Sequence, residues 1–142
     1  MEAAIFFGGI FIVIYLLYLN NRNETERKKV LDHNKNRPQL KKEAYIEQLA
    51  EKGFEKKHIE AYYDETKKII GIENFTMYPE DNIYENYCLW DLDDIDLIDN
   101  VCEKLGIRKA EQKDLDELGK TFNTMNAESV LTLMKMLEKK NS

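Results

Sequence analysis

The chain has 142 residues, a formal net charge of −6 and a hydrophobic content of 43%. This length leaves room for one small domain, and the eight Tyr, six Phe and one Trp argue against a disordered chain. The charge is uneven, because residues 69–103 contain ten Asp and Glu residues but no Lys or Arg. Such an acidic segment repels phosphate groups, so we do not expect a nucleic acid as a partner.

The first candidate element is an apolar run near the N-terminus. Residues 3–19, AAIFFGGIFIVIYLLYL, are 17 residues without a charge. As a helix they would span about 25 Å, close to the ~30 Å hydrocarbon core of a bilayer. We therefore expect a transmembrane signal anchor over residues 1–21, with residues 3–19 in the lipid bilayer. A cleaved signal peptide fits less well, since Glu2 stands where a basic segment would precede the run and no Ala-x-Ala site follows it.

Basic residues between positions 22 and 29 follow the apolar run. By the positive-inside rule they predict a single-pass protein of a bacterial inner or plasma membrane, with the N-terminus outside and the C-terminal domain in the cytoplasm. Cys88 and Cys102 fit a reducing cytoplasm as thiols of the core. The few charges leave the inverted topology open, which would place both cysteines in an oxidising compartment.

Beyond the anchor, residues 22–38 form a charged juxtamembrane linker that ends at Pro38, and residues 39–142 form an all-α domain. The spacing of apolar residues and the glycines that follow them predict helices over 39–53, 55–70, 93–106, 111–119 and 126–140. In the third of these, over residues 93–106, we expect Ile95 and Ile98 to face the core. Whether residues 39–52 belong to the core or to a stalk stays open.

Residues 72–90 break the helical period and predict a long loop held to the core by aromatic side chains. These side chains are Phe75, Tyr78, Tyr84, Tyr87 and Trp90. The chain has two histidines, His33 and His58, which stand apart from each other. We expect both on the surface and assign them no role.

Aspartates crowd the start of the helix predicted over residues 93–106: Asp91, Asp93, Asp94, Asp96 and Asp99. A calcium loop of the EF-hand type is excluded, because Ile95 and Cys102 stand where that loop needs oxygen ligands. The dipole of a helix favours carboxylates at its N-terminus, but one or two of them suffice. We therefore interpret the surplus as an acidic face that binds a basic patch on a partner protein.

The order of predicted elements and the segment WDLDDIDLIDNVCEKLGI resemble the acyl carrier protein family. The resemblance covers roughly residues 55–139 and implies a four-helix domain, here with an extra preceding helix. In that family a serine between two aspartates of an Asp-Ser-Leu-Asp motif carries phosphopantetheine. In this chain Asp94 stands at the serine position, within Asp93-Asp94-Ile95-Asp96, so no prosthetic group is expected.

Together these features predict a membrane-anchored protein-interaction module without enzymatic activity, bound metal or cofactor. Its partner would be a membrane-associated protein with a basic surface patch. Two alternatives stay open: a carrier of acyl or peptidyl groups with unusual attachment chemistry, and an inhibitor protein of the immunity type.

Overall fold

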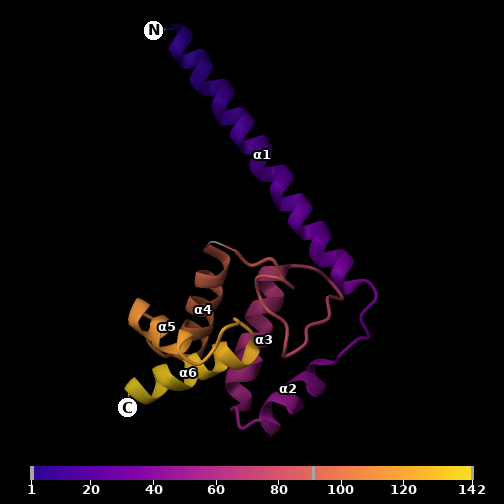
Figure 1. Cartoon of the computed structure of the whole chain (residues 1–142), viewed down its shortest axis with the longest axis vertical. Helices are drawn as coiled ribbons and strands as arrows, with labels where there is room; N and C mark the ends of the chain where they lie inside the picture. The colour runs from indigo at the N-terminus through magenta and orange to yellow at the C-terminus, as the bar shows by residue number, and fades with distance from the viewer. Residues whose placement is uncertain (1, 91, 142) are drawn as a thin grey trace. The chain divides into compact units, whose positions relative to one another are not determined.

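The computed structural model describes residues 2–90 and 92–141, apart from the side chains of residues 2–13, 19, 20, 22, 23 and 141. The helices are α1 (Glu2–Asn34), α2 (Lys42–Glu51), α3 (Lys56–Ile70), α4 (Leu92–Leu105), α5 (Gln112–Gly119) and α6 (Ala127–Asn141), as Figure 1 shows. Within the described residues there is no β-strand, so the all-α prediction is confirmed. The chain divides into two compact units, Met1–Asn36 and Arg37–Ser142.

The first unit consists of α1, a single helix of 33 residues that joins the apolar run to the charged segment after it. The apolar side chains of residues 14–18, the described part of the apolar run, are exposed, from 57% at Leu16 to 64% at Leu17. Nowhere in the described part of the chain is a helix long and apolar enough to cross a membrane. The predicted transmembrane anchor over residues 1–21 is therefore wrong.

A physical reason lies in the length of the run. A spanning helix needs about 20 apolar residues, whereas this run has 17 and α1 continues directly into polar and charged residues. The predicted single-pass topology and inner-membrane location rested on the anchor and are wrong with it. The side chains at positions 2–13 lie outside the described residues.

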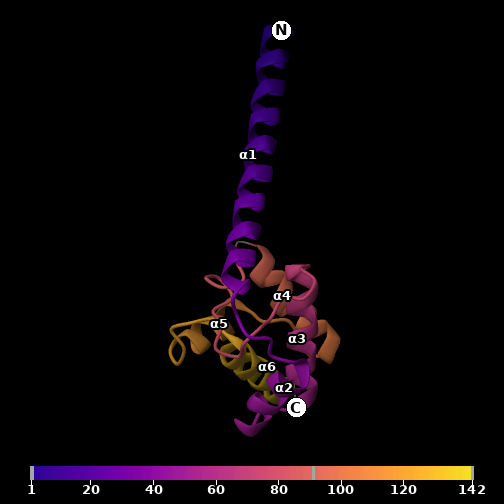
Figure 2. The ribbon, with the colours of Figure 1, turned by 90° about the vertical axis from the view of Figure 1, so that its right-hand side faces the viewer.

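The second unit is built around α3. This helix contacts α2, α4 and α6, and α5 packs on α6; the views in Figures 1 and 2 agree on this arrangement of the helices. The buried face of α3 includes Ile59, Ala61 and Tyr62, which lie three or fewer positions apart and turn toward its neighbours. From α6, Val130, Met134 and Leu137 are fully buried, as their helical spacing predicts.

The ends of these helices follow local chemistry. Gly71 ends α3 with a φ of 62° and donates its N–H to the carbonyl of Lys67, and Gly106 adopts a φ of 66° after α4. These left-handed conformations strain residues that have a Cβ atom, which explains glycine at both positions. Asn126 precedes α6 and accepts a hydrogen bond from the N–H of Ser129 at 3.1 Å, as expected for a capping residue.

The segment between α3 and α4 is an ordered loop that supplies part of the core. Met77 and Ile83 are fully buried in it, and Phe75 is 4% exposed. Its backbone joins the connection before α6, because the Ile83 N–H donates to the Met125 carbonyl at 2.9 Å. We expected a long loop held to the core by aromatic side chains, and the packing of Phe75 and Tyr87 agrees with this. Their rings meet edge to face, with 5.6 Å between the ring centroids.

One helical face differs from the prediction. We expected Ile95 to be buried, but it is 53% exposed, and Leu97 is fully buried in its place. The helix is rotated about its axis relative to our prediction. Leu97, Ile98 and Val101 form the larger apolar stripe of α4, and this stripe faces the core.

Candidate functional site

The acidic residues singled out in the sequence surround the first turns of α4. Asp93 and Asp96 are exposed, and Asp94 and Asp99 are half-buried. Asp91 lies outside the described residues. Asp93 and Asp94 lie in the first turn of α4, where the helix dipole stabilises negative charge.

Asp94 and Asp99 are tied to neighbouring side chains. The Tyr84 hydroxyl donates to Oδ2 of Asp94 at 2.8 Å, which links the loop to α4. Burial and this hydrogen bond raise the pKa of Tyr84 to about 12. Asp99 accepts a hydrogen bond from Lys109 at 2.5 Å, so its charge is balanced within the chain. The exposed acidic positions of α4's first two turns are Asp93 and Asp96.

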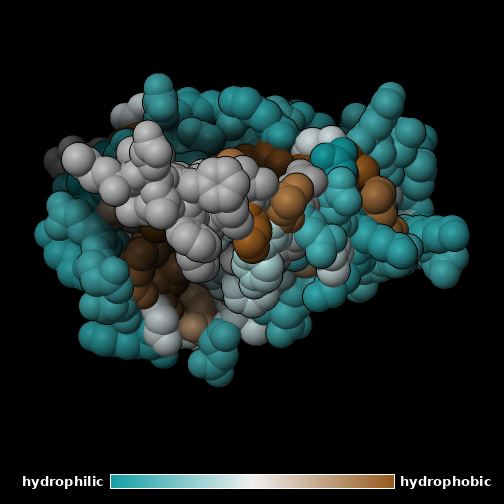
Figure 3. Space-filling view, turned by 90° about the horizontal axis from the view of Figure 1, so that it is seen from above, coloured by the Kyte–Doolittle hydropathy of each residue, from teal (hydrophilic) through white to brown (hydrophobic). Residues whose placement is uncertain are grey.

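Exposed apolar side chains accompany these two carboxylates. Leu92 is 69% exposed, Ile95 53% and Trp90 45%. Leu92, Ile95 and Asp96 share one face of α4, since positions three and four apart are neighbours on a helix. On the face seen in Figure 3, brown hydrophobic side chains lie at the surface between teal hydrophilic ones. We call Trp90, Leu92, Asp93, Ile95 and Asp96 the α4 surface.

Trp90 is held in place by stacking. Its ring lies 5.0 Å from that of Tyr84, at an interplanar angle of 26°. Tyr84 is in turn fixed by Asp94, so the aromatic pair belongs to the same arrangement as the start of α4. An exposed aromatic side chain with few free rotamers loses little entropy on binding, which suits it to an interface.

A second cluster joins the start of α3 to the end of α6, and sequence reasoning missed it. Ligand atoms of Glu55, His58 and Glu138 all lie within 4.8 Å of one another. His58 was expected on the surface, but it is only 2% exposed, because α6 packs against this face of α3. Glu55 and His58 are three positions apart, which was visible in the sequence, whereas Glu138 becomes their neighbour only through the tertiary fold.

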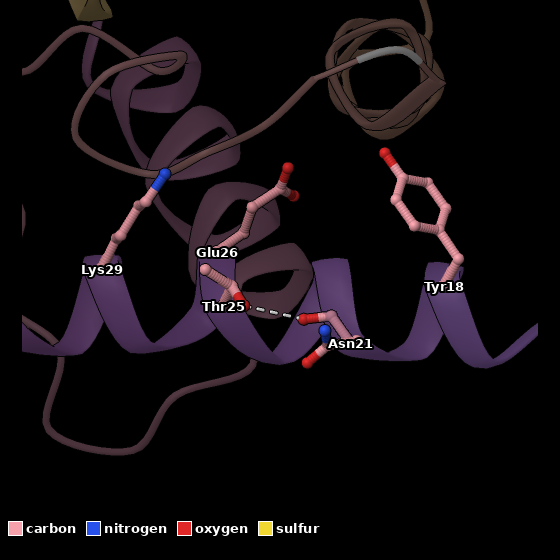
Figure 4. A pocket seen from close by; sticks show the side chains of 5 residues that line it. All are labelled: Tyr18, Asn21, Thr25, Glu26 and Lys29. Atoms are coloured by element: carbon pink, nitrogen blue, oxygen red, sulfur yellow. Dashed lines mark hydrogen bonds between the residues drawn. The ribbon is translucent and has the colours of Figure 1, made fainter.

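Two shallow surface depressions do not add to these sites. One is lined by Tyr18, Asn21, Thr25, Glu26 and Lys29, all from α1 (Figure 4). There the Thr25 hydroxyl donates to the Asn21 carbonyl at 2.9 Å, a bond within a single helix. The other lies between α3 and α4, where Lys104 is 3.6 Å and Lys68 3.4 Å from Glu65, so its described charges compensate one another.

No protein-family model matches the chain, no curated protein is significantly similar to it, and no solved structure matches it.

Proposed function

We propose that the second unit is a protein-interaction module without catalytic activity, whose α4 surface binds a basic, amphipathic segment of a partner protein. The observation that supports this most is the exposure of Trp90, Leu92 and Ile95 beside Asp93 and Asp96. Apolar side chains supply the area that is desolvated on binding, and the carboxylates select the charge of the partner.

The charge distribution favours a protein partner of positive charge. The stretch from residue 69 to residue 103 carries ten acidic side chains and no Lys or Arg. A partner helix with alternating basic and apolar positions would bury Leu92 and Ile95 and meet Asp93 and Asp96 with its cations. Association of this kind is faster at low salt, because opposite charges steer the encounter.

The order of elements supports the acyl-carrier-like scaffold as part of this proposal. α3, the loop, α4, the short α5 and α6 follow one another as in that family's four-helix domain. Carrier proteins bind their enzymes through the helix that corresponds to α4. Asp94 has no hydroxyl for phosphopantetheine, and its carboxylate instead accepts the hydrogen bond of Tyr84. We therefore favour a binding role over a carrier role.

The experiment combines cross-linking with matched variants of the full chain. A photo-reactive residue at Lys113, which is exposed on α5, captures neighbours without altering the α4 surface. Capture is compared among the wild type, Asp93→Asn/Asp96→Asn and Leu92→Ser/Ile95→Ser. Glu47→Gln/Glu51→Gln, which changes charge equally at exposed positions of α2, is the control.

The proposal expects a protein that is captured by the wild type and the control but lost with both variants of the α4 surface. The purified protein should then bind the wild type at least about tenfold more tightly than the Asp93→Asn/Asp96→Asn variant, and binding should weaken as salt is added. Capture lists that are the same for all four chains would overturn the proposal.

A further inference from the structure

The cluster of Glu55, His58 and Glu138 has the chemistry of a metal site. Imidazole nitrogen and carboxylate oxygen together suit first-row transition-metal ions such as Zn²⁺, whereas Mg²⁺ and Ca²⁺ prefer oxygen ligands alone. His58 comes from the first turn of α3, Glu55 from the residue that precedes this helix, and Glu138 from α6. The three ligands therefore come from the start of α3 and from α6, which the packing of the core fixes relative to each other.

A buried nitrogen without a hydrogen-bond partner points into this cluster. His58 is 2% exposed, and its Nε2 atom is buried without a hydrogen bond of acceptable geometry. Oε2 of Glu138 lies 3.3 Å from this nitrogen without forming a hydrogen bond to it. A buried polar atom that lacks a partner is costly, so the arrangement calls for a ligand at Nε2.

The separation of the two atoms fits a shared metal ion. Two ligands of a tetrahedral zinc ion, at 2.0–2.2 Å from the metal, are about 3.3–3.5 Å apart. The 3.3 Å between Nε2 of His58 and Oε2 of Glu138 falls in this range. The carboxylate of Glu55 does not cap α3 by a hydrogen bond, so it is available as a third ligand. Three protein ligands leave the fourth position to water.

The ammonium group of Lys57 lies next to the two carboxylates of the cluster. Nζ of Lys57 donates to Oε1 of Glu138 at 2.6 Å and lies 3.4 Å from Oε2 of Glu55. This hydrogen bond lowers the pKa of Glu138 and raises that of Lys57. The side chain of Lys57 is 55% exposed and flexible, so it can leave the two carboxylates for solvent when a cation of higher charge replaces it.

We propose that Glu55, His58 and Glu138 form a binding site for a divalent transition-metal ion of the Zn²⁺ class, for which Lys57 is the built-in competitor. A bound ion would join the start of α3 to the last turns of α6 and would stabilise that contact. The site is made of residues other than those of the α4 surface, so it stands or falls independently of the proposed docking function.

The test is calorimetric titration of the full chain with zinc chloride, with magnesium chloride as the comparison ion. We expect one Zn²⁺ per chain in the wild type and no comparable binding of Mg²⁺. Glu138→Gln and Glu55→Gln should each weaken Zn²⁺ binding at least about tenfold, and His58→Gln should abolish it. Lys57→Met removes the competing charge and should strengthen binding several-fold.

His33→Asn is the matched control, because His33 is the other imidazole of the chain and should not contribute. In the nitrogen-15 spectrum of this variant, the remaining imidazole should show a zinc-dependent shift of its Nε2 resonance. Since His58 is buried, Glu138→Gln is the decisive variant if His58→Gln unfolds. Zinc binding that survives Glu138→Gln and Glu55→Gln unchanged, or that disappears in His33→Asn, would overturn the proposal.

Discussion

The guanidinium of Arg37 donates two hydrogen bonds to the carboxylate of Asp81, at 2.9 and 2.8 Å. Asp81 is 5% exposed, and its Oδ2 atom also accepts hydrogen bonds from the Tyr87 hydroxyl at 2.9 Å and from the Tyr78 N–H at 3.0 Å. One buried carboxylate therefore fixes the start of the second unit to the loop between α3 and α4. The same loop carries Tyr84 and Trp90, so its order matters for the α4 surface.

The first prediction concerns this carboxylate. Asp81→Asn keeps the shape of the side chain but removes its charge, so the half-buried guanidinium of Arg37 then faces a neutral amide. We expect the free energy of unfolding to fall by about 2–4 kcal/mol in urea denaturation. Glu85→Gln, at an exposed position of the same loop, is the control and should change stability by less than about 0.5 kcal/mol. Equal effects of the two substitutions would contradict the central role of Asp81.

The second prediction compares two buried tyrosines. The Tyr45 hydroxyl is buried without a hydrogen-bond partner, whereas that of Tyr87 donates to Asp81. Because an unpaired buried hydroxyl costs free energy, Tyr45→Phe should keep or raise stability, by up to about 1 kcal/mol. Tyr87→Phe should lower stability by about 1–2 kcal/mol, since it removes a hydrogen bond to a charged group. Urea denaturation of both variants measures the change in the free energy of unfolding. A clear loss of stability in Tyr45→Phe would contradict the expectation for Tyr45.

The extent to which the sequence predicts this molecule depends on the range of the interactions. Glycines after α3 and α4 and Asn126 before α6 act on their own helix ends, and these ends were predicted from the sequence. The exposure of Ile95 was predicted wrongly, because Leu97 and Ile95 compete for the core and periodicity alone does not decide between them.

Interactions between distant segments were beyond such reasoning. His58 stands alone in the sequence, and only the packing of α6 on α3 buries it and brings Glu138 within 3.3 Å. Likewise the two hydrogen bonds between Arg37 and Asp81 depend on how the loop folds back on the start of the domain. The apolar run at the N-terminus was misjudged for another reason, because hydropathy was given more weight than the length of 17 residues.

The third prediction concerns thiol reactivity. Cys102 is fully buried, and burial raises the pKa of its thiol to about 11. At pH 8 only about one molecule in a thousand would carry the Cys102 thiolate, which is the reactive form. Cys88 is half-buried, so we expect one fast-reacting thiol per native chain and two after unfolding, measured with an aromatic disulfide reagent. Cys88→Ser should remove the fast reaction, and rapid modification of Cys102 in the native variant would contradict the protection of Cys102 by burial.

The fourth prediction concerns the acid stability of the contact between α5 and α6. Asp114 has no exposed side-chain area and accepts two hydrogen bonds from Arg108, at 2.8 and 2.9 Å, and one from Lys140 at 3.0 Å. It also accepts the N–H of Glu111 at 3.0 Å within a capping box at the start of α5. The hydrogen bonds from Arg108 are the main reason that the pKa of Asp114 lies well below its ordinary value.

The sign of the pH dependence follows from this shift. In the unfolded chain Asp114 titrates near pH 3.9, so below that pH the unfolded state binds the proton more readily than the folded state. The stabilisation by Asp114 is therefore complete above pH ~4 and is lost as the pH falls toward its folded pKa.

Asp114→Asn should lower the free energy of unfolding by about 2–4 kcal/mol at pH 7 and by clearly less near pH 2. Asp116→Asn, at an exposed position of α5, should have a small effect at both pH values. Urea denaturation of the three chains between pH 2 and pH 7 provides the measurement, and a difference between wild type and Asp114→Asn that does not change with pH would show that the ionised carboxylate is not the source of the stability.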